Sequence, residues 1–416
     1  MVFERPRGVR DFGPGEMGGR LHVESVLLGT FRSFGYRRVQ TPTFEFLELF
    51  SAKSGADISE HLYVFDDKGG RKLCLRPEAT AQVARMYSSE LRNLQKPLRL
   101  CYVSPMFRYE EPQKGRYREF WQAGVELIGA SGPEADAETV CLAGECLRRL
   151  GLKARIRVSH IGVLRELLNL QGLGETEQNR IIHLLDKGDY KTVQESIRDS
   201  PLIRLLDVRG SGESVDVALK LVPDGAAKRM LEDMKRTLNL LDAAGITYEV
   251  DFSMARGLDY YTGLVFDAKV EGLGAQNQVC GGGRYDNLIG LFGGPQTPAV
   301  GFAFGLDRLI DSMESQSINM AGYAPDAYVI CASEDVRTQA FAIADKLRKE
   351  APAKIIEVEI LGRKLNKALQ YAAEAGAKYA IIVGANELKE ESVMLKDMNL
   401  QKQAKVRISD IASHLT

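Results

Sequence analysis

Hydrophobic residues recur along the chain either at helical spacing or at every second position, as in strands. The places where one pattern gives way to the other mark the expected helices and strands. Apolar residues recur at helical spacing over residues 20–35. The chain then turns at Gly35 into a strand that ends near Pro42, because the residue before a proline favours extended backbone. Residues 73–75 predict a short strand that leads into a helix with Pro77 in its first turn. Further strands are predicted over residues 98–109, 118–129 and 154–160.

The pattern changes again in the second half of the chain. Residues 162–245 are rich in charged residues at helical spacing, which indicates an inserted helical module, and strand-like runs resume over 248–270 and 300–313. After a linker at 322–325, strands and helices alternate as β-α-β-α-β, which predicts a small α/β domain with a mostly parallel sheet. The expected domains are residues 1–321, with a helical insertion at about 162–245, and residues 326–416.

Composition narrows the class of protein only a little. Lys and Arg total 55 against 56 Asp and Glu in 416 residues, so binding of nucleic acid would have to rest on local patches. No long uncharged apolar stretch predicts a membrane span, and the charged N-terminus lacks the apolar core of a secretory signal. The six cysteines show no CxxC spacing, which favours reduced thiols over disulfides or a metal site. We expect a cytoplasmic protein.

One predicted strand carries polar residues on a face that should be buried. Within REFWQAGVELIG (118–129), one face presents Gln122, Gly124 and Glu126, and the opposite face is apolar. A solvated face would explain the pattern in an isolated strand. This strand lies in the middle of a domain, and the glycine leaves room above the sheet. The pattern therefore favours a small-molecule site on the sheet.

Three arginines follow strand ends or begin helices, namely Arg108, Arg256 and Arg308. Each taken alone is typical of a surface or structural arginine. Together they suit a triphosphate, because the planar guanidinium binds phosphate oxygens and stacks on flat rings. The chain has no GxxxxGK[ST] loop, and GGGRYD (281–286) lacks the spacing of a dinucleotide fingerprint, so a tight backbone turn is favoured there. None of the five histidines lies in a motif, which favours surface or packing roles.

Together these segments resemble the class II aminoacyl-tRNA synthetases. GYRRVQTP (35–42), FRYEEPQKGRYREFWQAGVELIG (107–129) and AVGFAFGLDRL (299–309) are similar to the three motifs of that class. RGLDYYTG (256–263), GGGRYD and LRPEATA (75–81) resemble the histidyl-tRNA synthetase family specifically. The resemblance implies an α+β catalytic domain built on an antiparallel sheet with a helical insert, followed by a C-terminal α/β anticodon-binding domain. It also implies a homodimer without membrane attachment, and tRNA, L-histidine, ATP and Mg²⁺ as partners.

The resemblance assigns roles to individual residues. The implied catalytic residues are Arg108, Arg256 and Arg308. The implied histidine-binding residues are Glu78, Ala79, Thr80, Arg108, Gln122, Glu126, Arg256, Tyr260, Tyr261 and Tyr285. The implied ATP-binding residues are Arg108, Glu110, Arg116, Arg256, Gly305 and Arg308. Glu126 is expected to accept the imidazole N–H, and Arg308 to stack on adenine. Gln113 and Lys114 are expected near the tRNA acceptor end.

Two positions depart from the family pattern. Ala79 stands where many relatives carry glycine, and Glu111 stands where some relatives place an arginine near the tRNA acceptor end. No general base is required for the implied reaction, because the attacking α-carboxylate titrates at roughly 3.3–3.7 and is ionised at neutral pH. The metal would be held largely by phosphates with one or two carboxylates, so no metal-ligand cluster is expected.

Other interpretations lead to different functions. A synthetase-like regulatory subunit of a phosphoribosyltransferase would bind histidine as a sensor, but such paralogues generally lack the C-terminal domain and lose arginines that this chain keeps. Another class II synthetase (glycyl, threonyl or prolyl) is disfavoured by RGLDYYTG and Glu126. In the C-terminal domain, charge alone is as compatible with a solvated helix face as with an RNA surface. The basic residues concerned are Arg363, Lys364, Lys367 and Lys378, interleaved with Tyr371 and Tyr379.

Overall fold

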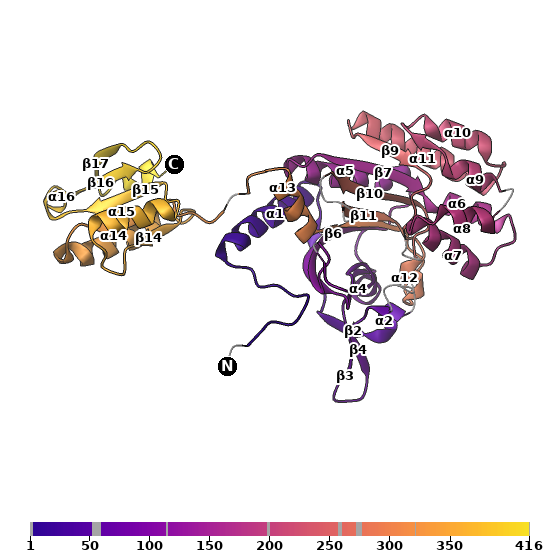
Figure 1. Ribbon diagram of the computed structural model, residues 1–416, viewed down its shortest axis with the longest axis horizontal. Helices are drawn as coiled ribbons and strands as arrows, with labels where there is room; N and C mark the ends of the chain where they lie inside the picture. The colour runs from indigo at the N-terminus through magenta and orange to yellow at the C-terminus, as the bar shows by residue number, and fades with distance from the viewer. Residues whose placement is uncertain are drawn as a thin grey trace. The chain divides into compact units, whose positions relative to one another are not determined.

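The computed structural model describes residues 3–51, 60–113, 115–197, 200–256, 260–271, 277–320 and 322–415, and the chain divides into two units, residues 1–321 and 322–416 (Figure 1). The first unit is built on a nine-stranded sheet with the strand order β1-β5-β6-β12-β11-β10-β7-β9-β8. Its six central strands pair antiparallel; they are β5 (Leu98–Phe107), β6 (Glu119–Ile128), β12 (Ala299–Gly305), β11 (Gln278–Arg284), β10 (Leu264–Val270) and β7 (Ala154–His160). The outer strands are β1 (Arg37–Arg38), β9 (Tyr248–Asp251) and β8 (Arg209–Gly210).

Alternation of side chains along the strands gives the sheet two different faces. The apolar face, with Phe302 and Val125 in register, packs against α1 (Pro14–Ser33), α5 (Pro133–Arg149) and α13 (Leu306–Ser315). Phe31 of α1 meets Phe302 edge to face, with ring centroids 6.2 Å apart. The other face is open to the candidate site, and α4 (Thr80–Met86), a π-helical turn (Tyr87–Leu91) and α12 (Leu288–Leu291) lie on that side (Figure 1).

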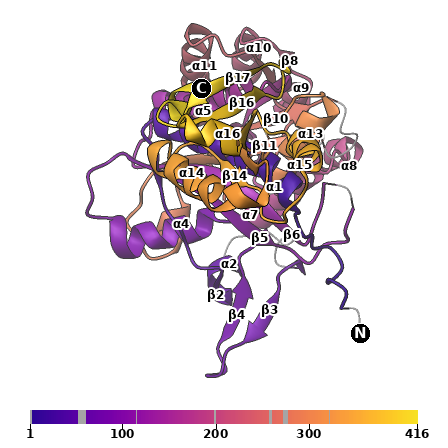
Figure 2. The same ribbon diagram turned by 90° about the vertical axis from the view of Figure 1, so that its left-hand side faces the viewer.

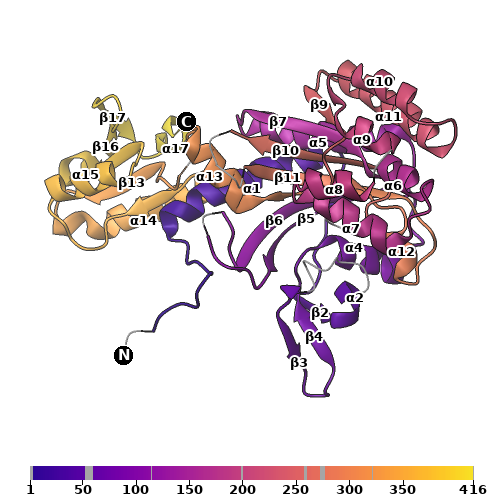
Figure 3. The same cartoon turned by 45° about the vertical axis from the view of Figure 1, so that its right-hand side comes forward.

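The segment between β7 and β9 forms a helical module at one end of the sheet (Figure 3). Over its described residues it contains α6 (Ile161–Asn169), α7 (Glu175–Asp186), α8 (Tyr190–Ser196), α9 (Pro201–Leu206), α10 (Ser214–Leu221) and α11 (Ala226–Ala243). Apolar residues of α11, including Leu231, Leu238 and Leu241, are buried because the helix packs on α5 and α6.

A small second sheet projects from the first unit as an arm (Figure 2). Its order is β2 (Phe44–Phe46), β4 (Lys72–Leu75) and β3 (Val64–Asp66), and the short helix α2 (Leu47–Ser51) follows β2. Phe44, Phe46 and Phe65 are exposed on this arm, and the rings of Phe44 and Phe65 meet edge to face. An exposed aromatic patch of this kind is typical of an interaction surface.

The second unit is an α/β domain with the strand order β14-β13-β15-β16-β17. Its elements are β13 (Ala327–Cys331), a 3₁₀ turn (Glu334–Val336), α14 (Arg337–Glu350), β14 (Ile356–Val358), α15 (Leu365–Glu374), β15 (Tyr379–Val383), α16 (Ala385–Lys389), β16 (Ser392–Asp397), β17 (Gln403–Arg407) and α17 (Ile411–His414). Only β14, β13 and β15 are parallel. The three predicted strands are parallel as expected, but the sheet as a whole is mixed, because β16 and β17 add two antiparallel pairings.

The predicted fold class, an α+β domain on an antiparallel sheet followed by an α/β domain, is confirmed. Two local predictions are wrong. The helix expected to contain Pro77 begins at Thr80, because the Glu78 carboxylate accepts the N–H groups of Thr80 and Ala81 and so caps the helix there. The glycines of GGGRYD lie inside strand β11 and do not form a tight turn. Among the described residues, no helix has the length and apolar character that crossing a membrane requires.

Candidate active site

The open face of the sheet is floored by small residues that the strand register brings into rows. One row runs Tyr102, Gly124, Ala303, Gly281 across four strands, and the next contains Glu126, Gly301 and Gly283. Residues directly opposite each other in an antiparallel ladder share a face. Gly281, Gly301 and Ala303 of these rows help to line a cavity of about 770 Å³ above the sheet.

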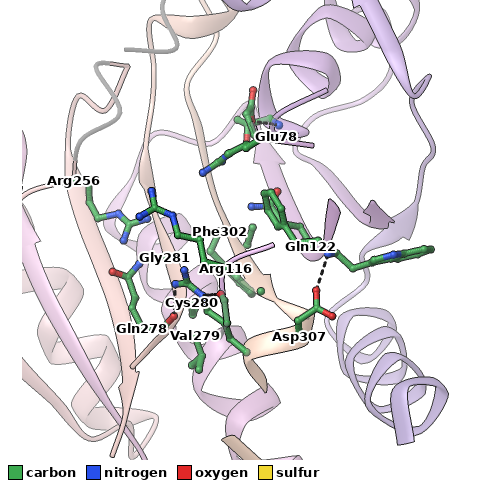
Figure 4. Close-up of a pocket in the computed structure, with 18 of the residues that line it drawn as sticks. Glu78, Arg116, Gln122, Arg256, Gln278, Val279, Cys280, Gly281, Phe302 and Asp307 are labelled. Atoms are coloured by element: carbon green, nitrogen blue, oxygen red, sulfur yellow. Dashed lines mark hydrogen bonds between the residues drawn. The ribbon is translucent and has the colours of Figure 1, made fainter. Parts of the chain in front are cut away.

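The three arginines predicted as catalytic all line this cavity, and so does Arg116. Figure 4 shows the guanidinium groups of Arg256 and Arg116 pointing into the same space. Burial lowers the pKa of Arg308; Glu110 opposes the shift, and Arg108, Arg116 and Arg256 reinforce it by repulsion. All four cations line one cavity, and that concentration of positive charge suits a polyanion.

Three of these arginines are held by particular acceptors. Arg108 donates from Nε to the Pro77 carbonyl at 3.0 Å and lies 5.2 Å from the centroid of the Phe120 ring. Arg308 donates to the carbonyls of Gly115 at 3.1 Å and Gln278 at 3.0 Å. Arg116 forms an ion pair with Glu110, and both line the cavity. Backbone acceptors thus orient two guanidinium groups without neutralising them.

Gly281 explains the position of Arg256. A Cβ atom at residue 281 would lie only 2.6 Å from Nη1 of Arg256, with Nη2 and Cζ nearer still. The glycine therefore provides the space in which the guanidinium rests on strand β11. Gly282 and Gly283 are also packed closely, against Phe302 and Tyr261. Close approach of neighbours, and not a turn, accounts for the three consecutive glycines.

A buried carboxyl group with hydroxyl donors lies beneath the other end of the cavity. Glu126 accepts a hydrogen bond from Thr80 at 2.8 Å, a second from Tyr102 at 3.4 Å and a third from the Tyr285 hydroxyl. Burial raises its pKa to about 8; the hydroxyl donors oppose the shift and the Glu78 carboxylate adds to it. Glu126 is 1% exposed and is not among the residues that line the cavity.

Tyrosines form one wall beside this carboxyl group. The ring centroids of Tyr260 and Tyr261 are 5.0 Å apart, and those of Tyr260 and Tyr285 are 5.9 Å apart. All three line the cavity together with Glu78, Thr80 and Gln122. Burial raises the pKa of each tyrosine, so the hydroxyl groups stay protonated. The wall can donate hydrogen bonds to a flat polar ring.

The remaining predicted site residues differ in whether they reach the cavity. Gly305 lines the cavity, whereas Ala79 is packed in the core and Gln113 is exposed outside the cavity lining. Lys114 and the GLD segment of RGLDYYTG (257–259) lie outside the described residues.

The structure also adds residues that sequence reasoning missed. The space expected above Gly124 is filled by Tyr102, since a Cβ atom there would lie 2.5 Å from the Tyr102 Cζ. His61, expected at the surface or in packing, lines the cavity. Asp307 lines it beside Arg308, and the helical module contributes Asp186 and Lys187. Of these residues, Asp307 alone lies in a motif that the sequence singled out, GLDRL; His61, Asp186 and Lys187 lie in none of the motifs.

Comparisons with known proteins agree along the whole chain. A family model described as histidyl-tRNA synthetase matches residues 8–309, and a model described as an anticodon binding domain matches residues 326–416. The histidine–tRNA ligase of Archaeoglobus fulgidus is 42% identical over 424 residues and covers 100% of both chains. That of Methanocaldococcus jannaschii is 43% identical over 426 residues and covers 99% of both. The crystal structure of histidyl-tRNA synthetase from Nostoc sp. PCC 7120 has a TM-score of 0.85 at 22% identity, covering 100% of this chain and 99% of that chain, which supports the fold.

Proposed function

The chain belongs to the histidyl-tRNA synthetase family of class II aminoacyl-tRNA synthetases, and we propose that it activates histidine with ATP to histidyl-adenylate and pyrophosphate, and then transfers the histidyl group to the 3′ end of its tRNA. The observation that carries the proposal is the convergence of four arginines on a cavity that also adjoins a carboxyl and tyrosine cluster. One end of the cavity suits a triphosphate, and the other suits a small polar ring.

In the first step, the histidine carboxylate attacks the α-phosphorus of ATP and pyrophosphate leaves. The carboxylate is already ionised, so the protein must hold two anions together and stabilise the charge that develops on the phosphate. Arg108 and Arg256 hold the carboxylate and the α-phosphate. Arg308 stacks on adenine and faces the γ-phosphate, while Glu110 and Arg116 contact the adenine and triphosphate ends, and Gly305 lets the nucleotide approach the sheet.

Histidine is recognised at the tyrosine end of the cavity. Glu78 and Thr80 hold its α-amino group with Gln122 nearby, and Ala79 supports this turn from the core. The imidazole lies against Tyr260 and Tyr261, and its N–H takes the place of one hydroxyl donor on Glu126, for example that of Tyr285. Sites built to pair a buried polar group reject analogues that lack the matching group by about 10⁴–10⁵.

Mg²⁺ would accompany ATP. Within the described part of the chain, no three His, Cys, Asp or Glu side chains gather to hold a metal ion. Glu110 is the carboxylate in the β5–β6 connection that faces the arginine end of the cavity. This donor set fits an ion held mainly by phosphates, which would supply further charge neutralisation to the triphosphate.

The remaining parts of the chain would serve the tRNA and assembly. We assign residues 1–321 to the catalytic domain, with the insertion at about 162–245, and residues 326–416 to anticodon binding. Gln113 and Lys114 would face the acceptor end. The exposed aromatic arm, which directly follows the GYRRVQTP segment, supports a homodimer, and sedimentation would measure it.

ATP–pyrophosphate exchange tests the function. With histidine, glycine, threonine and proline offered in turn, only histidine should support exchange. Arg256→Ala should lower the exchange rate by about 10²–10³ while the thermal melting curve stays cooperative, because the guanidinium stabilises charge and is not part of the core. Exchange with another amino acid would identify a different synthetase, and exchange with none would identify a histidine sensor. The retained arginines and the match over residues 326–416 disfavour a sensor.

A further inference from the structure

An N-terminal segment, residues 7–12 (the strap), crosses the base of the loop that joins β5 to β6. This β5–β6 loop, residues 108–118, carries Glu110 and Arg116 into the cavity. None of the six strap residues, all of which the structure describes, lines the cavity itself. Any effect of the strap on the reaction must therefore act through the residues that it touches.

The strap contacts both arms of the β5–β6 loop. Arg7 pairs with Glu111 at 3.0 Å on the outgoing arm, where both side chains are exposed. On the returning arm, Arg118 donates its N–H to the Gly8 carbonyl at 2.8 Å. Gly8 has φ +88°, and a Cβ atom there would lie 2.8 Å from Arg118 Cδ and 2.9 Å from Pro112 Cγ. Glycine is therefore needed for the strap to lie this close to the loop.

Arg10 makes the connection with the most buried partner. Its Nη2 donates to Asp307 Oδ1 at 2.6 Å, and its guanidinium lies 3.8 Å from the centroid of the Tyr117 ring. Tyr117 follows Arg116 in the loop and lines the cavity. One planar group thus joins the returning arm of the loop to the start of α13. A guanidinium can make both contacts at once because it hydrogen-bonds in its plane and stacks on its face.

Asp307 links four parts of the catalytic unit. It is 5% exposed, and Oδ1 also accepts a hydrogen bond from Arg20 of α1 at 2.8 Å, while Oδ2 accepts the Trp121 N–H of β6 at 3.0 Å (Figure 4). Arg308, the next residue, donates to the Gly115 carbonyl in the loop. An unneutralised buried carboxylate here would repel a triphosphate, so the two arginines on Asp307 both anchor it and remove that repulsion.

We propose that the strap holds the β5–β6 loop and α13 in the arrangement that binds ATP, with Arg10 as the positioning residue. The inference rests on the proposed adenylation. The strap contacts the β5–β6 loop and Asp307 at the arginine end of the cavity, whereas Glu126 and the tyrosine wall lie at the other end. Loss of Arg10 therefore affects ATP and not histidine.

The test uses pyrophosphate exchange on the full chain, with KM measured separately for each substrate. Arg10→Met should raise the KM for ATP about 10-fold or more, because ATP then meets a β5–β6 loop and an α13 that are no longer held in the binding arrangement; a 10-fold change corresponds to about 1.4 kcal/mol of binding. The KM for histidine should stay within about 2-fold, because the strap does not reach that end of the cavity. Arg10→Lys should restore part of the loss, since it keeps the charge and loses the planar fork. Arg5→Met removes an exposed contact to Asp11 and should match the parent protein.

Tyr117→Leu is a second route to the same result, because it removes the ring on which Arg10 stacks. It should show the same selective rise in the KM for ATP, and it keeps the test open if Arg10→Met fails to fold. An unchanged KM for ATP in both variants, or an equal rise for both substrates with a lower melting temperature, would overturn the inference. A parent protein without histidine-dependent exchange would instead overturn the proposed function.

Discussion

Substitution of Gly281 by alanine should disable adenylation by displacing the guanidinium of Arg256. The added Cβ would lie 2.6 Å from Nη1 of Arg256, where ordinary contacts begin near 3.4 Å. The guanidinium is the end of a flexible side chain and can move, so the protein should still fold. It would move by about 1 Å, and misplacement of this size can reduce a rate by about 10². That factor corresponds to about 2.7 kcal/mol of transition-state stabilisation.

The assay is ATP–pyrophosphate exchange at saturating histidine, together with the melting temperature. Gly281→Ala should lower the exchange rate about 100-fold with a small change in melting temperature. Gly29→Ala is the matched control, because a Cβ atom at that helical position meets nothing within 4 Å. It should leave exchange unchanged and stabilise the fold by about 0.5–1 kcal/mol.

A double variant separates this mechanism from general disruption of the sheet. If Gly281→Ala acts only by moving Arg256, adding it to Arg256→Ala should reduce exchange no further, because residues that act as one unit are not additive. A further 100-fold loss in the double variant would refute the reasoning. So would near-parental exchange in Gly281→Ala alone.

The other predictions concern pH and stability. Because burial raises the pKa of Glu126 to about 8, and an ionised carboxylate accepts an N–H hydrogen bond more strongly than the protonated acid, kcat/KM for histidine should rise with pH through about 8. Glu126→Gln should lower and flatten that profile and leave the KM for ATP unchanged; a rise that persists in this variant would contradict the assignment. The pKa of Glu126 is higher in the folded protein than in the unfolded chain, so its contribution to the free energy of unfolding should fall as the pH rises towards 8. Arg157→Met should lower the free energy of unfolding by about 3–5 kcal/mol, because it removes the cation from buried Asp267, which it contacts at 2.6 Å. The exposed ion pair between Arg236 and Asp233 gives the comparison. Arg236→Met should leave the free energy of unfolding in urea almost unchanged, because solvent screens an exposed pair, and similar losses in the two variants would contradict the argument.

Local patterns in the sequence were sufficient for most of the elements. Strand β7 has the predicted bounds, residues 154–160, because alternation and flanking residues define a strand without reference to its neighbours. The helix after LRPEATA was misplaced because its start depends on a side-chain cap from Glu78. The antiparallel strands β16 and β17 pair with their neighbours in sequence, but the alternation within one strand does not specify which strand it pairs with or in which direction, so the sheet's antiparallel part was not predicted.

The sequence by itself determined the chemical types at the site and the family to which the chain belongs, because short strings such as RGLDYYTG keep their identity without a structure. Tertiary structure decided which of these residues meet. Gly124, Ala303 and Gly281 form one row only because strand β6 pairs in register with β12, which lies far away in the sequence, and β12 pairs in register with β11. That register puts Tyr102 over Gly124, leaves space for Arg256 on Gly281 and brings Arg10 to Asp307. Such contacts depend on the summed packing of the whole domain, so they cannot be deduced from local spacing.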